Sequence, residues 1–143
     1  GIAHIALNVS SLEKSKEFYS QLLPFLGMRL VHESSKSFYY IGSRTAILLQ
    51  KIDNVKNSSF SQNKIGLHHF CFRARSEIDV NLVHKKLLEI NANIVRGPIH
   101  GDWAEGYYYI LFEDPDNIRI EVNFVPEKGV LNEGAKFNPS GDY

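Results

Sequence analysis

The feature that most constrains this chain is an internal repeat. The segment Gly1-Ile-Ala-His-Ile-Ala-Leu resembles Gly66-Leu-His-His-Phe-Cys-Phe at an offset of 65 residues. The same offset places Leu22 against Leu87, so the correspondence continues from a predicted strand into a predicted helix without a gap. Self-similarity at a constant offset is typical of two copies of one structural unit. The 143 residues are therefore predicted to fold as two related modules.

Each copy opens with an alternating run and continues with a helical stripe. In the first copy, the residues that alternate between two faces are His4, Ala6 and Asn8 on one side and Ile5, Leu7 and Val9 on the other. This period of two predicts a strand. Ser10, followed by Glu13, is typical of a capping box that opens a helix, and Gly27 predicts its end.

Shorter alternating runs follow each predicted helix. They cover residues 29–32, 37–41 and 44–50 in the first copy, and 93–96, 107–112 and 118–125 in the second. Each half is therefore predicted to be β-α-β-β-β, and the fold class to be α+β. We expect one domain over residues 1–125, made of modules 1–52 and 65–125 joined by a polar loop at 53–64. Residues 126–143 are predicted to form a C-terminal tail.

Composition narrows the classes of function. Lys and Arg number 16, as do Asp and Glu, and this balance argues against nucleic-acid binding through a basic surface. No run of 18 apolar residues is present, so we expect no membrane span. Cys71 is the single cysteine, which excludes an internal disulfide. These features favour a cytoplasmic protein whose partner is a small molecule.

Several short motifs, taken in order, resemble one superfamily. They are Gly1-x-x-His4-Ile-x-Leu-x-Val9, Lys16-x-Phe18-Tyr19-x-x-Leu22-Leu23, Gly66-x-x-His69, Asp114-Pro-Asp and Ile120-Glu121. Together with the repeat, this set resembles the vicinal oxygen chelate superfamily, which includes glyoxalase I, bleomycin and fosfomycin resistance proteins, methylmalonyl-CoA epimerases and extradiol dioxygenases. The resemblance covers residues 1–125. It implies that two tandem βαβββ modules form an open, barrel-like mixed sheet with a central metal cup.

Strand alternation indicates which side chains could face that cup. The larger apolar residues of each strand must pack against a helix, so His4, His69 and Glu121 fall on the opposite face, whereas His68 points the other way. A glutamate in such a strand is costly if it is buried without a partner, and a cation would remove that cost. Two histidines and one carboxylate can hold a divalent transition metal with open positions.

The resemblance implies that His4, His69 and Glu121 are ligands of a divalent ion such as zinc, nickel, manganese, cobalt or iron. It also implies a fourth ligand at the end of the first half. Aligning Tyr39-Tyr40-Ile41 with Tyr108-Tyr109-Ile110, and allowing for a longer second turn, pairs Glu121 with Gln50. A slip of two residues would pair it with Leu48 and leave three protein ligands.

Aromatic and polar residues around these positions are candidates for substrate binding. The resemblance implies that Tyr107 and Tyr109 line the cup, with Trp103 nearby, although aromatic residues are also common in the packed core of strands. Arg119 and Asn123 flank the predicted carboxylate ligand on its face. Arg119 could bind an anionic group of the substrate, or it could pair with a neighbouring acid.

The resemblance implies a metal-dependent lyase, isomerase or epimerase acting on a small oxygenated molecule. The metal would stabilise an enolate or alkoxide, and Glu121 could act as a catalytic base if it can leave the metal. Two alternatives remain open: a drug-binding resistance protein without catalytic activity, and an Fe(II) extradiol-type dioxygenase. The resemblance also implies a homodimer.

Overall fold

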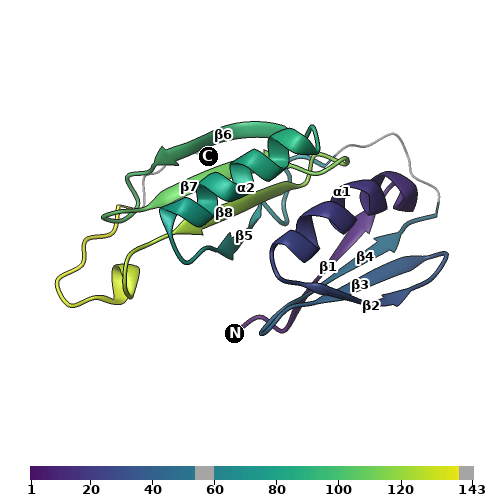
Figure 1. The fold of residues 1–143 in the computed structure, drawn as a ribbon, viewed down its shortest axis with the longest axis horizontal. Helices are drawn as coiled ribbons and strands as arrows, with labels where there is room; N and C mark the ends of the chain where they lie inside the picture. Colours follow the sequence, from purple (N-terminus) through teal and green to yellow (C-terminus); the bar gives the residue numbers. More distant parts are fainter. Residues whose placement is uncertain (54–59, 139–143) are drawn as a thin grey trace. The chain divides into compact units, whose positions relative to one another are not determined.

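The computed structural model describes residues 1–53 and 60–138, and its chain divides into two compact units (Figure 1). Unit 1 comprises Gly1–Phe60 together with Asp114–Asn117, and unit 2 comprises Ser61–Glu113 and Ile118–Tyr143. Parts of the predicted loop and tail, residues 54–59 and 139–143, lie outside the described residues.

Unit 1 contains one helix and a four-stranded mixed sheet. Its elements are β1 (His4–Val9), α1 (Leu12–Phe25), β2 (Arg29–Glu33), β3 (Ser37–Ile41) and β4 (Ala46–Lys51). The strand order is β1-β4-β3-β2, with β1 parallel to β4 and the other neighbours antiparallel.

Unit 2 repeats this arrangement. Its elements are β5 (Phe70–Arg73), α2 (Glu77–Glu89), β6 (Asn93–His100), β7 (Tyr108–Glu113), β8 (Arg119–Phe124) and a short 3-10 helix at Gly129–Leu131. The order β5-β8-β7-β6, with β5 parallel to β8, matches that of unit 1. The predicted α+β class and the two tandem βαβββ modules are therefore confirmed.

Helix α1 begins one residue later than the sequence pattern predicted. Its N-cap is Ser11, whose side chain accepts a hydrogen bond from the backbone of Lys14. The predicted cap, Ser10, instead donates its backbone N–H to Asp116 at 2.9 Å and its hydroxyl to the same carboxylate. A longer-range partner has thus displaced Ser10 from the capping role, whereas Gly27 ends the helix with φ of 82° as predicted.

The core of unit 1 includes a buried polar contact with the Asp114–Asn117 turn. The hydroxyl of Tyr19 on α1 donates to Oδ2 of Asp114 at 2.7 Å, and both residues are buried. Burial and the neighbouring Asp114 carboxylate raise the pKa of Tyr19 well above its usual value. Tyr19 therefore stays neutral in the folded protein and remains a donor.

Helix α2 covers one face of the unit 2 sheet, where it contacts β6, β7 and β8 (Figure 1). Tyr108 on β7 donates to Asn81 on α2 at 2.9 Å, so Tyr108 and every second residue after it face the helix. The residues between them, including Leu111 and its pairing partner Glu121, face away from α2. This alternation places Glu121 on the face of the sheet that α2 does not cover.

Within residues 1–53 and 60–138, none of the helices has the length and apolar character needed to cross a membrane.

Candidate metal-binding site

Glu121 lies in the middle of β8, and its side chain is fully buried. The strand register places it between Cys71 on β5 and Leu111 on β7, on the face of the sheet opposite α2. A buried carboxylate in a regular strand needs partners for both of its oxygens. The two oxygens of Glu121 have different surroundings.

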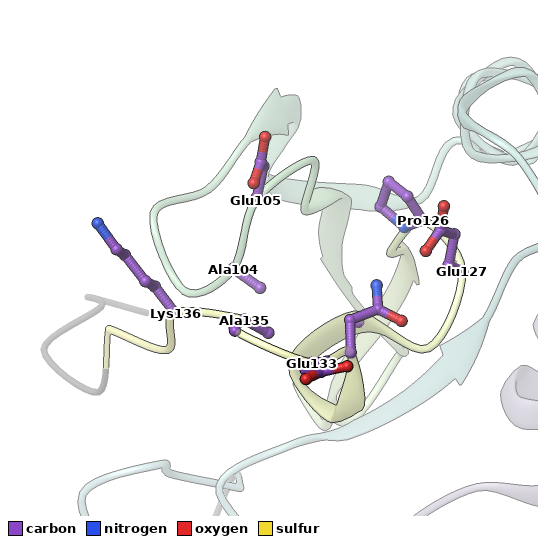
Figure 2. Close-up of a pocket in the computed structure, with 10 residues that line it drawn as sticks. Ala104, Glu105, Pro126, Glu127, Glu133, Ala135 and Lys136 are labelled. Atoms are coloured by element: carbon purple, nitrogen blue, oxygen red, sulfur yellow. The ribbon is translucent and has the colours of Figure 1, made fainter.

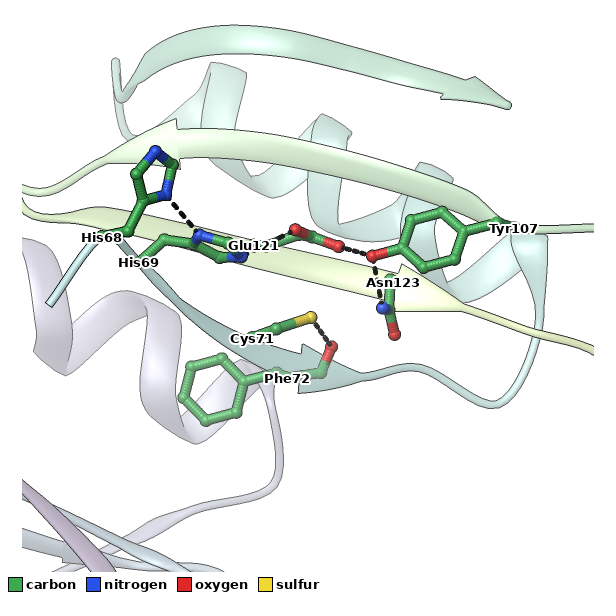
Figure 3. A network of polar contacts seen from close by, with 7 residues as sticks. All are labelled: His68, His69, Cys71, Phe72, Tyr107, Glu121 and Asn123. Carbon is green, nitrogen blue, oxygen red and sulfur yellow. Dashed lines mark hydrogen bonds and ion pairs between the residues drawn. The ribbon is translucent and has the colours of Figure 1, made fainter. Parts of the chain in front are cut away.

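The Oε2 atom of Glu121 faces a histidine. His69 immediately precedes β5, and its Nε2 atom lies 3.2 Å from Oε2 (Figure 3). The pair lacks the geometry of a hydrogen bond, and Oε2 has no hydrogen-bond partner among the described residues. Nε2 of His69 and Oε2 of Glu121 are thus within ion-pair distance but form no hydrogen bond.

This spacing fits two ligands of one metal ion. Metal–nitrogen and metal–oxygen bonds of about 2.1 Å place two ligand atoms about 3.0 Å apart at a right angle and about 3.4 Å apart at the tetrahedral angle. The observed 3.2 Å lies between these limits. Imidazole and carboxylate are also donor types that divalent transition metals accept. The unpartnered Oε2 atom and the spacing are therefore compatible with a metal ion shared by this pair.

The far side of the His69 ring contacts His68. The two Nδ1 atoms lie 2.7 Å apart, so one ring must donate and the other must accept (Figure 3). Burial lowers the pKa of His68, and the nearby His69 and Arg119 lower it further. When Nδ1 of His69 is the donor, its Nε2 atom is unprotonated, which is the form that binds metals.

The second carboxylate oxygen, Oε1, accepts a hydrogen bond from the hydroxyl of Tyr107 (Figure 3). The side-chain amide of Asn123 in turn donates to the Tyr107 oxygen at 2.8 Å. Burial and the bond to Glu121 raise the pKa of Tyr107, so the hydroxyl keeps its proton. Asn123 was predicted to flank Glu121, and in the structure its amide contacts Tyr107, whose hydroxyl donates to Glu121.

Cys71 shares this face of the sheet with Glu121. The residue is exposed and forms no disulfide. Desolvation of the thiol and the neighbouring Glu121 carboxylate raise the pKa of Cys71 well above its usual range. The thiol is therefore protonated near neutral pH.

In unit 1, His4 occupies the first position of β1, opposite Ala46 on β4. Leu48 pairs with Ala6, just as Glu121 pairs with Cys71, and Cys71 matches Ala6 at the repeat offset. Leu48 is therefore the structural counterpart of Glu121.

The alignment of Glu121 with Gln50 is wrong by two residues. It relied on matching Tyr39-Tyr40-Ile41 with Tyr108-Tyr109-Ile110. In the structure, Tyr39 lies opposite Leu48 and Leu111 lies opposite Glu121. The counterpart of Tyr39 is therefore Leu111 and not Tyr108. Gln50 pairs with Asn8, four residues beyond the level of His4, or about 13 Å along the strands. The counterpart of Gln50 in unit 2 is Asn123, which contacts Tyr107.

The predicted substrate-binding aromatics differ in their exposure. Tyr109 and Trp103 are buried and pack against each other with ring centroids 5.2 Å apart, beside Leu111. Only Tyr107 is partly exposed. Arg119 forms an ion pair with Glu113 at 3.4 Å, which is the neighbouring-acid alternative that the sequence left open.

The sequence did not indicate a pocket of about 420 Å³ at the C-terminal segment of unit 2 (Figure 2). Three carboxylates, those of Glu105, Glu127 and Glu133, line it together with Lys136. Its lining includes neither His69 nor Glu121.

Across the part of the chain that the structure describes, no group of three or more His, Cys, Asp or Glu side chains is placed to hold a metal ion. Unit 2 therefore supplies two donors, His69 and Glu121. His4, the third predicted ligand, belongs to unit 1.

Known proteins resemble this chain over most of its length. An uncharacterised protein of Bacillus subtilis (strain 168), YqjT, is 28% identical over 123 residues, which cover 83% of this chain and 94% of that protein. The crystal structure of a candidate glyoxalase from Bacillus halodurans has a TM-score of 0.78 and 28% identity, with 86% of this chain and 94% of that chain covered.

Two more distant structures share the fold. Lactoylglutathione lyase from Agrobacterium tumefaciens has a TM-score of 0.63 at 21% identity, over 87% of this chain and 92% of that chain. The fosfomycin resistance protein FosX from Listeria monocytogenes has a TM-score of 0.63 at 18% identity, over 90% and 93%. A sequence model of the Glyoxalase/Bleomycin resistance protein/Dioxygenase superfamily matches residues 1–122. The chain therefore belongs to this superfamily.

Proposed function

We propose that the protein is a metal-dependent lyase, isomerase or epimerase that acts on a small oxygenated molecule. The observation that carries this proposal is the buried Oε2 atom of Glu121, which has no hydrogen-bond partner among the described residues and lies 3.2 Å from Nε2 of His69. Membership of the superfamily supports it, and the superfamily resemblance adds His4 as a third ligand.

A bound divalent ion would supply Lewis-acid stabilisation of negative charge on a substrate oxygen. His69 and Glu121 would hold the ion, and Nε2 of His69 is available as a ligand when Nδ1 of the same ring donates to His68. Glu121 is also the candidate base, because its Oε2 atom, which has no hydrogen-bond partner among the described residues, could accept a substrate proton after leaving the ion.

Metal analysis of the purified protein tests this proposal. We expect about one equivalent of a divalent metal per chain in the wild type, and a large loss in His4→Ala, His69→Ala and Glu121→Gln. His84→Ala, a histidine substitution on α2, is the control and should keep the wild-type metal content. Metal content that is unchanged in the His69 and Glu121 variants would show that the site is wrong.

Substitution of Gln50 is expected to leave the metal content unchanged. Its place in the register, level with Asn8, predicts that Gln50→Ala keeps the metal and that the protein ligands number three. Loss of metal from this variant would restore Gln50 as the fourth ligand.

The alternative functions differ in their dependence on metal. A tight ligand that binds equally well after chelation would favour a drug-binding resistance protein. Oxygen uptake with a catechol by the iron-loaded, anaerobically prepared protein would favour an extradiol-type dioxygenase.

A further inference from the structure

The side chains of Tyr107 and Asn123 form a chain of hydrogen bonds that ends on Glu121. Neither residue contacts His69 through a hydrogen bond in Figure 3, and both lie on the side of the carboxylate away from it. The two carboxylate oxygens of Glu121 therefore have different partners. Oε1 accepts from Tyr107, and Oε2 faces His69.

The direction of these hydrogen bonds is fixed by their chemistry. An amide nitrogen can only donate, so Asn123 occupies a lone pair of the Tyr107 oxygen. The single hydroxyl proton of Tyr107 is then left for Glu121, whose Oε1 atom accepts it. Asn123 thus orients a donor toward Oε1 and away from any other acceptor.

We infer that Tyr107 and Asn123 are positioning residues that anchor Glu121 through Oε1 and reserve Oε2 for the metal ion. This inference rests on the proposed function. Because one oxygen is already bound, Glu121 would hold the ion through a single oxygen rather than through both. The same anchor would keep the carboxylate in place if Oε2 left the metal to take a proton.

The sheet supports this arrangement. Tyr107 directly precedes β7, and Asn123 lies two residues beyond Glu121 on β8, on the same face. The Tyr107 ring packs against those of Trp103 and Tyr109, with centroids 5.1 Å and 5.7 Å away. These buried neighbours limit the movement of the phenol, so its hydroxyl is held before a metal arrives.

Titration with Co²⁺, followed by its visible absorption bands, tests the inference. We expect Tyr107→Phe to weaken Co²⁺ binding by about ten- to hundredfold and to change the absorption spectrum, because the carboxylate is free to rotate. Tyr108→Phe is the matched control: it also removes one tyrosine hydrogen bond from the same region, but that bond reaches Asn81 on the opposite face. It should bind Co²⁺ as the wild type does.

A second variant separates positioning from a general loss of structure. Asn123→Ala should weaken Co²⁺ binding severalfold in the wild type but have no further effect in the Tyr107→Phe background, because its action passes through the tyrosine. Independent effects of the two substitutions would contradict the inference. Circular dichroism of each metal-free variant checks that it is folded.

Glu121→Gln distinguishes the failure of this inference from that of the proposed function. If this variant loses Co²⁺ binding while Tyr107→Phe binds with wild-type affinity and spectrum, the metal site stands and the anchoring role is wrong. If the wild type binds no Co²⁺, or Glu121→Gln binds it normally, both proposals fail together.

Discussion

The side chain of Glu121 is fully buried, and only its Oε1 atom has a hydrogen-bond partner among the described residues. A buried, incompletely paired carboxylate opposes folding. A cation bound between Oε2 and Nε2 of His69 would give the carboxylate an oppositely charged partner and so lower the free energy of the folded state. Metal binding should therefore stabilise the fold through this residue.

Thermal unfolding of the chelated and metal-loaded protein measures this effect. Free metal at a hundredfold excess over Kd should stabilise the wild type by about 2.7 kcal/mol, because the ion binds the folded state. Glu121→Gln should show little response to metal, since the neutral amide is a poor ligand. An equal rise of Tm in both proteins would place the stabilising ion elsewhere.

At the scale of elements, the turn between β7 and β8 belongs to unit 1, where its Asp114 carboxylate accepts from Tyr19 on α1. Backbone N–H of Asp116 also donates to Asp114 within the turn, at 2.8 Å. The second carboxylate of the turn, that of Asp116, binds Ser10 just ahead of α1. The two acidic residues of this turn therefore bind helix α1, through Tyr19, and the segment that precedes the helix, through Ser10.

Substitution Tyr19→Phe tests the contribution of this contact. It removes a donor to a buried carboxylate, so we expect a loss of roughly 1–3 kcal/mol in the free energy of unfolding near pH 7. Urea unfolding of the two proteins gives this difference. A difference below about 0.5 kcal/mol would show that the hydrogen bond contributes little.

The same variant should change the dependence of stability on alkaline pH. The pKa of Tyr19 is raised in the folded protein, so above about pH 10 the unfolded chain releases this proton while the folded protein retains it. The stability due to Tyr19 is thus present below pH 10 and is lost as the pH rises. The decline should be less steep in Tyr19→Phe, by at most about 1.4 kcal/mol per pH unit, and the two slopes should agree below pH 9.

At the scale of the whole molecule, the repeat is visible in topology more than in side chains. Both units have the same strand order, yet the position that holds Glu121 in unit 2 holds Leu48 in unit 1. The two copies therefore share a backbone fold but carry different side chains at the candidate ligand position.

Sedimentation equilibrium tests the oligomeric state. The superfamily resemblance predicts a homodimer, so the expected mass is twice that of the 16.3 kDa chain. A species of 16.3 kDa alone, across micromolar concentrations, would contradict this prediction.

Sequence periodicity was sufficient for the βαβββ modules, and it placed His69 and Glu121 on one face. It succeeded because alternation along a strand is a local property of the backbone. The capping-box pattern placed the N-cap of α1 one residue early, since it did not reveal the hydrogen bonds of Ser10 to Asp116.

The sequence by itself determined the two modules, their class and the faces on which the candidate ligands lie. The tertiary structure alone decided which residues meet across strands: Leu48 rather than Gln50 as the counterpart of Glu121, and Tyr107 as the partner of its Oε1 atom. The physical reason is that strand register depends on pairing between segments distant in the chain, and a shift of two residues preserves every face while changing every neighbour.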